Sequence, residues 1–307
     1  MHQVKGWKSI ALIFMLSILG LSFVLAGCSP YPQGDGGQPV TVKPVPQRII
    51  SLAPSHTETL FALGLGDKVV GVTDFCDYPA EALGKEKVGG FADPNLEKII
   101  SLKPDLVIAN NLHEQIAAEL GRVGIAVVVS NPRNVAEILD SIKVIGQATG
   151  TEAAAEALIK NINQDVSAVT EKVKALDPSS KPVVYYEVWH EPLMTVGPGT
   201  VMDDLINLAG GINIGADADK EYPEYSEEVL IQKNPQVMIH SYAHGTAEAD
   251  NSATIRTRRG WENLACIRNS RIYLVDPNLA TRPGPRIAEG LWLFARAIHP
   301  ELFAKQS

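Results

Sequence analysis

Short apolar runs and amphipathic segments alternate through the first half of the folded chain. Runs of about four to eight apolar residues between polar or turn residues are typical of buried strands. Such runs lie at residues 48–52, 69–72, 105–108 and 126–129. Helical periodicity occupies intervals between them, at residues 57–63, 96–102 and 116–121. Strands separated by helices indicate parallel pairing with right-handed crossovers, and therefore an α/β fold.

The longest helical pattern covers residues 152–176, which contain neither glycine nor proline. At 1.5 Å per residue, a segment of about 25 residues predicts a helix about 37 Å long. Asp177 and Pro178 end it. A helix of this length between two α/β halves is expected to act as a stiff spine.

The order of helix, proline and strand then repeats on the far side of this spine. Glu97 lies seven residues before Pro104, and Glu228 lies seven residues before Pro235, with an apolar run after each proline. Weaker repeats link residues 58–64 with 204–210 and residues 123–129 with 270–275. Two similar halves around one helix predict two lobes with a ligand cleft between them.

The N-terminus has the layout of an exported protein. Lys5 and Lys8 precede an apolar stretch at residues 10–25, which leads through Ala26 and Gly27 to Cys28. A charged region, an apolar core and small residues before a cleavage site are typical of a secretory signal. The Ala-Gly-Cys order resembles a bacterial lipobox, in which Cys28 would be lipidated. The alternative is an uncleaved membrane anchor with a chance cysteine.

The expected domain boundaries follow from these patterns. We expect a signal peptide at residues 1–27 and a flexible tether at 28–46, which is rich in Pro, Gly, Gln and Ser. The N-terminal α/β lobe is expected at 47–150, the interlobe helix at 151–178 and the C-terminal α/β lobe at 179–307. No apolar run of about 18 residues follows the leader, so no later segment is expected to span a bilayer.

Composition and charge narrow the class of protein. A chain of 307 residues with 45% hydrophobic content can bury a large core. Its net charge of -8 argues against nucleic acid or an anionic membrane surface as the main partner. Cys76 and Cys266 are far apart in sequence and are expected to remain unpaired.

Sequence motifs argue against an enzyme. The chain contains no Gly-x-Ser-x-Gly elbow, phosphate-binding Gly-x-x-x-x-Gly-Lys-Ser/Thr loop, His-Glu-x-x-His or Cys-x-x-Cys pair. No catalytic residue is therefore assigned. A receptor for a bare metal ion is a third class, because His56, His190, His240 and His244 are candidate ligands.

Several side chains are candidates for ligand contact. Trp189 and His190 follow the apolar strand at residues 183–186, where a cleft would open. The indole of Trp189 would cover a macrocycle edge, or it packs within the lobe. His56 and His190 would donate to a ligand or coordinate its metal, or they are ordinary loop histidines. Arg282 would pair with an anionic group, or it braces its loop.

Five segments together carry a resemblance to a known family. They are residues 49–58, 76–79, 95–97, 103–107 and 282–287. With the exported leader, these motifs resemble the helical-backbone solute-binding proteins of ABC importers, and most of all the cobalamin-binding proteins. The resemblance covers about residue 47 to the C-terminus. It implies two Rossmann-like lobes joined by one long α-helix, docking onto a permease dimer, and no resident cofactor or metal.

The resemblance also implies a ligand and particular contacts. The ligand would be a corrinoid, with a ferric siderophore, haem or oxyanion as the alternative. The family's aromatic contacts fall on Phe75 and on Phe91, where other members have tryptophan. Its loop contacts fall between Asp276 and Arg282, including Asn278.

The matched glutamates of the two halves have a separate implied role. By the resemblance, Glu97 and Glu228 lie on the outer surface of the two lobes and bind arginines of the permease. A receptor with two similar halves can present one carboxylate to each subunit of a permease dimer. The alternative is that both are solvated glutamates that stabilise the helix dipole.

Overall fold

Two parallel sheets form the centres of the two lobes in the computed structural model, which describes residues 45–241 and 252–303. The N-terminal sheet has the order β3-β2-β1-β4-β5. Its strands are β1 (Ile49–Ser51), β2 (Val69–Val72), β3 (Glu86–Lys87), β4 (Leu106–Ala109) and β5 (Ala126–Val129). Its connecting helices are α1 (Pro54–Ala62), α2 (Leu96–Ser101) and α3 (Glu114–Arg122). The strands and helices that the first half of the sequence predicts are therefore present, with ends shifted by a few residues.

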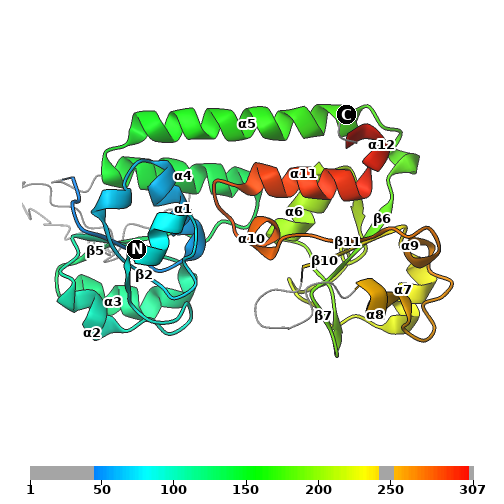
Figure 1. Ribbon diagram of the computed structural model, residues 1–307, viewed down its shortest axis with the longest axis horizontal. Coiled ribbons are helices and arrows are strands. Elements are labelled where there is room, and N and C mark those ends of the chain that lie inside the picture. The colour runs from blue at the N-terminus through cyan, green and yellow to red at the C-terminus, as the bar shows by residue number, and fades with distance from the viewer. Residues whose placement is uncertain (1–44, 242–251, 304–307) are drawn as a thin grey trace, which may run out of the picture.

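The C-terminal sheet has the order β11-β10-β6-β9 and is also parallel. Its strands are β6 (Val183–Glu187), β9 (Ile212–Asn213), β10 (Val237–His240) and β11 (Ile272–Leu274). The helices of this half are α6 (Val201–Leu208), α7 (Glu227–Lys233), α8 (Ser252–Arg256), α9 (Ala265–Arg268), α10 (Pro277–Ala280), α11 (Ile287–Ile298) and α12 (Pro300–Phe303). An antiparallel hairpin of β7 (Trp189–His190) and β8 (Leu193–Met194) extends from the end of β6 (Figure 1). The expected α/β class with two lobes is confirmed.

One long helix joins the lobes, as the sequence predicts, but the helix before it was not predicted. The long helix α5 (Glu152–Lys174) is present, but a second helix, α4 (Val135–Thr149), precedes it. Asn134 caps the start of α4 by accepting a bond from the Glu137 amide at 2.9 Å, and Gly150 ends it in the left-handed region at φ 68°. Figure 1 shows α4 and α11 end to end beneath α5. Helix α5 therefore joins the lobes and packs against α4 of the N-terminal half and α11 of the C-terminal half.

One apolar cluster runs through this helical layer from lobe to lobe. It includes Ile142 of α4, Val169 of α5, Leu205 of α6 and Leu291 of α11, all with at most 1% of their surface exposed. The layer is amphipathic rather than uniformly apolar. None of the helices in the described ranges has the length and hydrophobicity needed to cross a bilayer. The two lobes consequently share a core on this side.

The other face of each sheet has its own smaller core. Cys76 and Cys266 are both buried, one in each lobe, and neither forms a disulfide. The Thr57 hydroxyl donates to the Cys76 sulfur at 3.1 Å. The predicted signal peptide, Cys28, residues 28–44 of the tether and His244 lie outside the described residues.

Candidate ligand-binding cleft

A cavity of about 650 Å³ lies where the two lobes face each other. The N-terminal lobe contributes the start of α1 and the loops that follow β2, β4 and β5. The C-terminal half contributes the start of α6, the loop before α7 and the segment after α10. Most of the N-terminal contributions come from the carboxyl ends of parallel strands, which is where α/β proteins bind their ligands.

Aromatic rings and neutral polar groups are prominent in this lining. Phe75 is 50% exposed, and Phe91 lies in the loop that follows β3. The neutral polar residues of the lining are Ser55, Asn110, Asn111, Ser130, Asn131, Thr200, Tyr222 and Thr281. Such a surface offers flat apolar contacts together with many hydrogen-bond donors and acceptors.

Half of the ligand contacts expected from the sequence reach this cavity. His56, Phe75, Phe91 and Arg282 line it. Trp189, His190, Asp276 and Asn278 are not part of its lining.

The other four residues have local roles in the structure. Trp189 is on the β7–β8 hairpin, where its indole nitrogen donates to the Glu191 carbonyl at 2.9 Å. Its ring contacts that of His190, with centroids 5.3 Å apart. Asp276 caps the short helix α10 by accepting a bond from the Asn278 amide at 2.8 Å. Ligand contact by these four residues stays a prediction.

His56 is a neutral group in the cavity wall. The pKa of His56 is lowered to about 4, first by burial and second by nearby His113, while a backbone bond with Ser130 opposes the shift. Its Nδ1 atom is buried and has no hydrogen-bond partner among the described residues. An uncharged imidazole at this place can bond to a ligand group without adding charge to the cleft.

His113 holds the Phe91 loop in place. The Asn110 amide donates to His113 Nδ1 at 3.2 Å, so the proton is on Nε2, which donates to the Phe91 carbonyl at 2.7 Å. The rings of Phe91 and His113 also meet edge to face, 5.7 Å apart. Burial lowers the pKa of His113, which favours the neutral imidazole with its proton on Nε2.

Arg282 braces the lobes instead of offering a free cation. Its Nη1 donates to Glu58 at 3.2 Å and to Asp77 at 2.7 Å. Arg286 binds both oxygens of Glu58, at 2.7 and 2.8 Å, and its guanidinium stacks 3.9 Å from the Tyr78 ring centre. Glu58 is only 3% exposed. Of the two roles that the sequence allows for Arg282, the geometry favours bracing.

A second ion pair joins the lobes beside the cavity. Arg133, in the loop between β5 and α4, donates to the carboxylate of Glu221 and to the Gly199 carbonyl at 3.0 Å. Glu221 and Gly199 both belong to the C-terminal half. The sequence did not predict this pair. It also did not predict the polar lining residues Asn110, Asn111, Ser130 and Asn131, although they lie within three residues of the ends of predicted strands.

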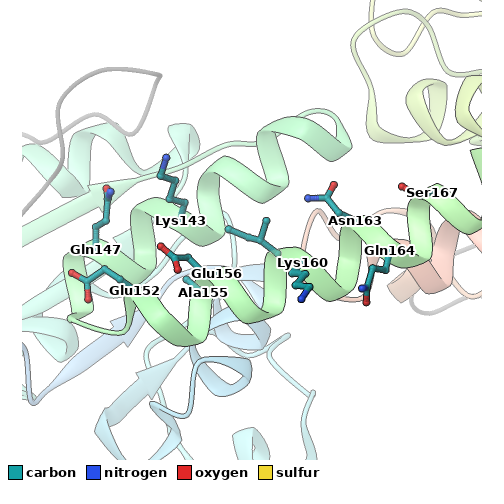
Figure 2. A pocket seen from close by; sticks show the side chains of 10 residues that line it. Lys143, Gln147, Glu152, Ala155, Glu156, Lys160, Asn163, Gln164 and Ser167 are labelled. Carbon is teal, nitrogen blue, oxygen red and sulfur yellow. The ribbon is translucent and has the colours of Figure 1, made fainter.

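A larger hollow, of about 810 Å³, lies along the outside of α4 and α5 (Figure 2). Lys143 and Gln147 extend into it from α4, and Glu152, Glu156 and Lys160 from α5. It contains no aromatic side chain and mixes charges of both signs, as solvated helix surfaces do. The cleft between the lobes is therefore the better ligand site.

The histidines do not form a metal centre in the part of the chain that the structure describes. No group of three or more His, Cys, Asp or Glu side chains converges there. His56 lines the cleft, His190 is on the hairpin, and His240 is buried at the end of β10. The bare-metal alternative gains no support from these positions.

Two α/β lobes with a cleft at their strand ends, joined by packed helices, define a solute-binding receptor. The chain belongs to the periplasmic binding protein family, whose sequence model matches residues 49–279. It is 37% identical to the uncharacterized ABC transporter substrate-binding lipoprotein YvrC of Bacillus subtilis, over 94% of this chain and 96% of that protein. It is 31% identical to the vitamin B12-binding protein of Vibrio cholerae, over 81% of this chain and 88% of that one.

Solved structures agree on the architecture. A possible iron-binding periplasmic protein from Staphylococcus epidermidis is 32% identical, with a TM-score of 0.73 over 83% of this chain and 99% of that one. The periplasmic haem-binding protein RhuT of a Roseiflexus species is 26% identical, with a TM-score of 0.72 over 82% of this chain and 99% of that one. The resemblance to ABC-importer solute-binding proteins is thereby confirmed.

Proposed function

We propose that the protein captures a corrinoid outside the cytoplasm and delivers it to an ABC permease. The observation that carries this proposal is the balance of charge in the cleft. Every charged side chain that the described residues contribute to the lining has a partner of opposite charge: Arg133 pairs with Glu221, and Arg282 with Glu58 and Asp77. The rest of the lining, which includes Phe75, Phe91 and the neutral polar residues, carries no charge. A flat macrocycle with amide arms matches this surface.

The alternative ligands differ in charge. Haem carries carboxylates, and ferric siderophores and oxyanions are commonly anionic, so each would be bound best by unpaired arginine or lysine. The relatives named as vitamin B12-binding support the corrinoid. Because some similar structures are named as iron- or haem-binding, haem and ferric siderophores are included in the binding test.

Titration with a panel of ligands tests this function. We expect cyanocobalamin to bind more tightly than haemin, a ferric siderophore or molybdate, as measured by calorimetry or quenching of tryptophan fluorescence. Phe75→Ala removes an aromatic contact and is expected to weaken cyanocobalamin binding about tenfold, which corresponds to about 1.4 kcal/mol.

A matched substitution controls for loss of apolar surface. Leu83 is exposed and lies outside the cleft lining, so Leu83→Ala should leave affinity unchanged. Stronger binding of haemin or a siderophore than of cyanocobalamin would overturn the corrinoid assignment.

We further propose that Cys28 anchors the receptor to the cell membrane through a lipid. Support comes from the lipobox-like sequence Ala26-Gly27-Cys28 and from the lipoprotein name of the Bacillus subtilis relative. Cys28→Ser is expected to release the protein from washed membranes without changing ligand affinity, as followed by fractionation and immunoblotting. Retention of the variant with its leader uncleaved would favour a membrane-spanning leader instead.

We also propose that Glu97 and Glu228 dock the receptor onto its permease, and their positions support this role. Each is the second residue of a short helix, α2 or α7, whose start is capped by a side chain: Asn95 binds the Lys98 amide at 2.9 Å and Ser226 binds the Val229 amide. Both glutamates are exposed. Figure 1 shows α2 and α7 on the same edge of the molecule, opposite α5. A permease that straddles both lobes would meet one carboxylate on each.

A further inference from the structure

The ion pair between Arg133 and Glu221 crosses from one lobe to the other at the cavity. Arg133 is held at three points, because its amide donates to Glu137 at 2.8 Å and its side chain binds Gly199 and Glu221. Gly199 lies in the left-handed region at φ 78°, and a Cβ atom there would come within 2.7 Å of the Arg133 guanidinium. The close approach of the arginine therefore depends on glycine at this position.

The pair retains free hydrogen-bonding capacity that faces the cavity. Both side chains are 47% exposed, and both residues line the cleft. Within the described residues, the side chain of Glu221 accepts a hydrogen bond at Oε1 alone, and the side chain of Arg133 donates from Nε and from one terminal nitrogen. An acceptor oxygen and a guanidinium donor are thus left side by side.

We propose that Arg133 and Glu221 are specificity-determining residues that select ligand arms ending in primary amides over arms ending in carboxylates. A primary amide has one acceptor and two donors, so it can accept from Arg133 and donate to Glu221 at the same time. A carboxylate has no donor and would meet the negative charge of Glu221. This selection rests on the proposed function. It adds that the receptor recognises the amide ends of the ligand's arms.

The remaining charged groups of the cleft cannot perform this selection. Arg282 is 9% exposed, and it already binds Glu58 and Asp77. His56 is neutral at physiological pH because its pKa lies near 4. Among the described lining residues, the Arg133–Glu221 pair is therefore the charged feature that a ligand arm meets.

Comparing two corrinoid probes tests the proposal. Dicyanocobinamide keeps the amide arms, whereas dicyanocobyrinic acid carries carboxylates in their place. The wild-type protein should prefer the amide probe, and Glu221→Gln should reduce that preference at least about tenfold, mainly by tighter binding of the acid. Asp217→Asn serves as the control, since it removes an exposed carboxylate that pairs with Lys233 away from the cleft. It should leave the preference unchanged.

Each outcome bears on one of the two claims. If the wild-type protein binds dicyanocobinamide and Glu221→Gln keeps the same preference within about twofold, the selection is refuted while the proposed function stands. If the wild-type protein binds neither corrinoid, the proposed function fails. Haemin then becomes the probe: tighter binding of this dianion by Glu221→Gln than by Asp217→Asn supports the selection, and equal binding refutes it. Circular dichroism of each variant verifies the fold.

Discussion

Glu58→Gln is expected to lower the free energy of unfolding by about 3–5 kcal/mol, the cost of removing one partner from a buried ion pair. Glu58 is 3% exposed and binds both Arg282 and Arg286. Glutamine has nearly the same shape but no charge, so it would leave two poorly solvated guanidinium groups without the buried carboxylate that binds them both, while the half-exposed Asp77 would still pair with Arg282. Urea denaturation monitored by circular dichroism measures the loss.

An exposed carboxylate provides the matched comparison. Glu97→Gln makes the same chemical change at the surface and should shift the free energy of unfolding by less than about 0.5 kcal/mol. Should Glu58→Gln cost no more than Glu97→Gln, the arginine cluster would not hold the lobes together, and Arg282 would again be a candidate ligand contact.

Reversing the charge of both matched glutamates is expected to abolish most transport. In Glu97→Arg with Glu228→Arg, arginines would face the arginines of the proposed permease pockets, and repulsion would replace pairing. We expect uptake in cells to fall more than about tenfold, equivalent to at least 1.4 kcal/mol of docking free energy. Ligand affinity and fold should persist, because exposed ion pairs typically contribute less than about 1 kcal/mol. Each single variant should lose part of the activity.

The control for this experiment lies on the opposite edge of the molecule. Glu156 and Glu171 are exposed on α5, so Glu156→Arg with Glu171→Arg changes the net charge equally without touching α2 or α7. If the Glu97 and Glu228 double variant takes up ligand as the wild type does, or if the α5 variant loses as much uptake, docking by these residues is refuted. Both glutamates would then be solvated residues at helix starts.

The local pattern of apolar residues was sufficient to predict the longer strands of both sheets, but not the two-residue edge strands β3 and β9. Buried parallel strands appear as continuous apolar runs, and β2 and β5 have the bounds that those runs predict. The repeat around Pro104 and Pro235 anticipated that α2 and α7 would be equivalent. Helix α4 was missed although Val135, Ile138, Ile142 and Ile145 follow helical spacing.

The cleft was only partly accessible from the sequence, because its polar contacts join distant segments. Arg133 and Glu221 are 88 residues apart, and Arg282 lies 224 residues from Glu58. The hydrophobic periodicity of a sequence does not show which distant side chains form ion pairs. The sequence alone therefore left the role of Arg282 undecided. Phe75 and Phe91, which the resemblance selects as ligand contacts, both line the cavity.

The apolar cluster shared by α4, α5, α6 and α11 has a consequence for building a ligand sensor from this receptor. A pair of fluorophores on the two lobes reports a ligand only if the distance between them changes, and a common core resists a wide hinge motion. The useful signal would be local instead. A single environment-sensitive dye at the rim of the cleft, beside Leu112 in the loop after β4, would record the exchange of water for ligand.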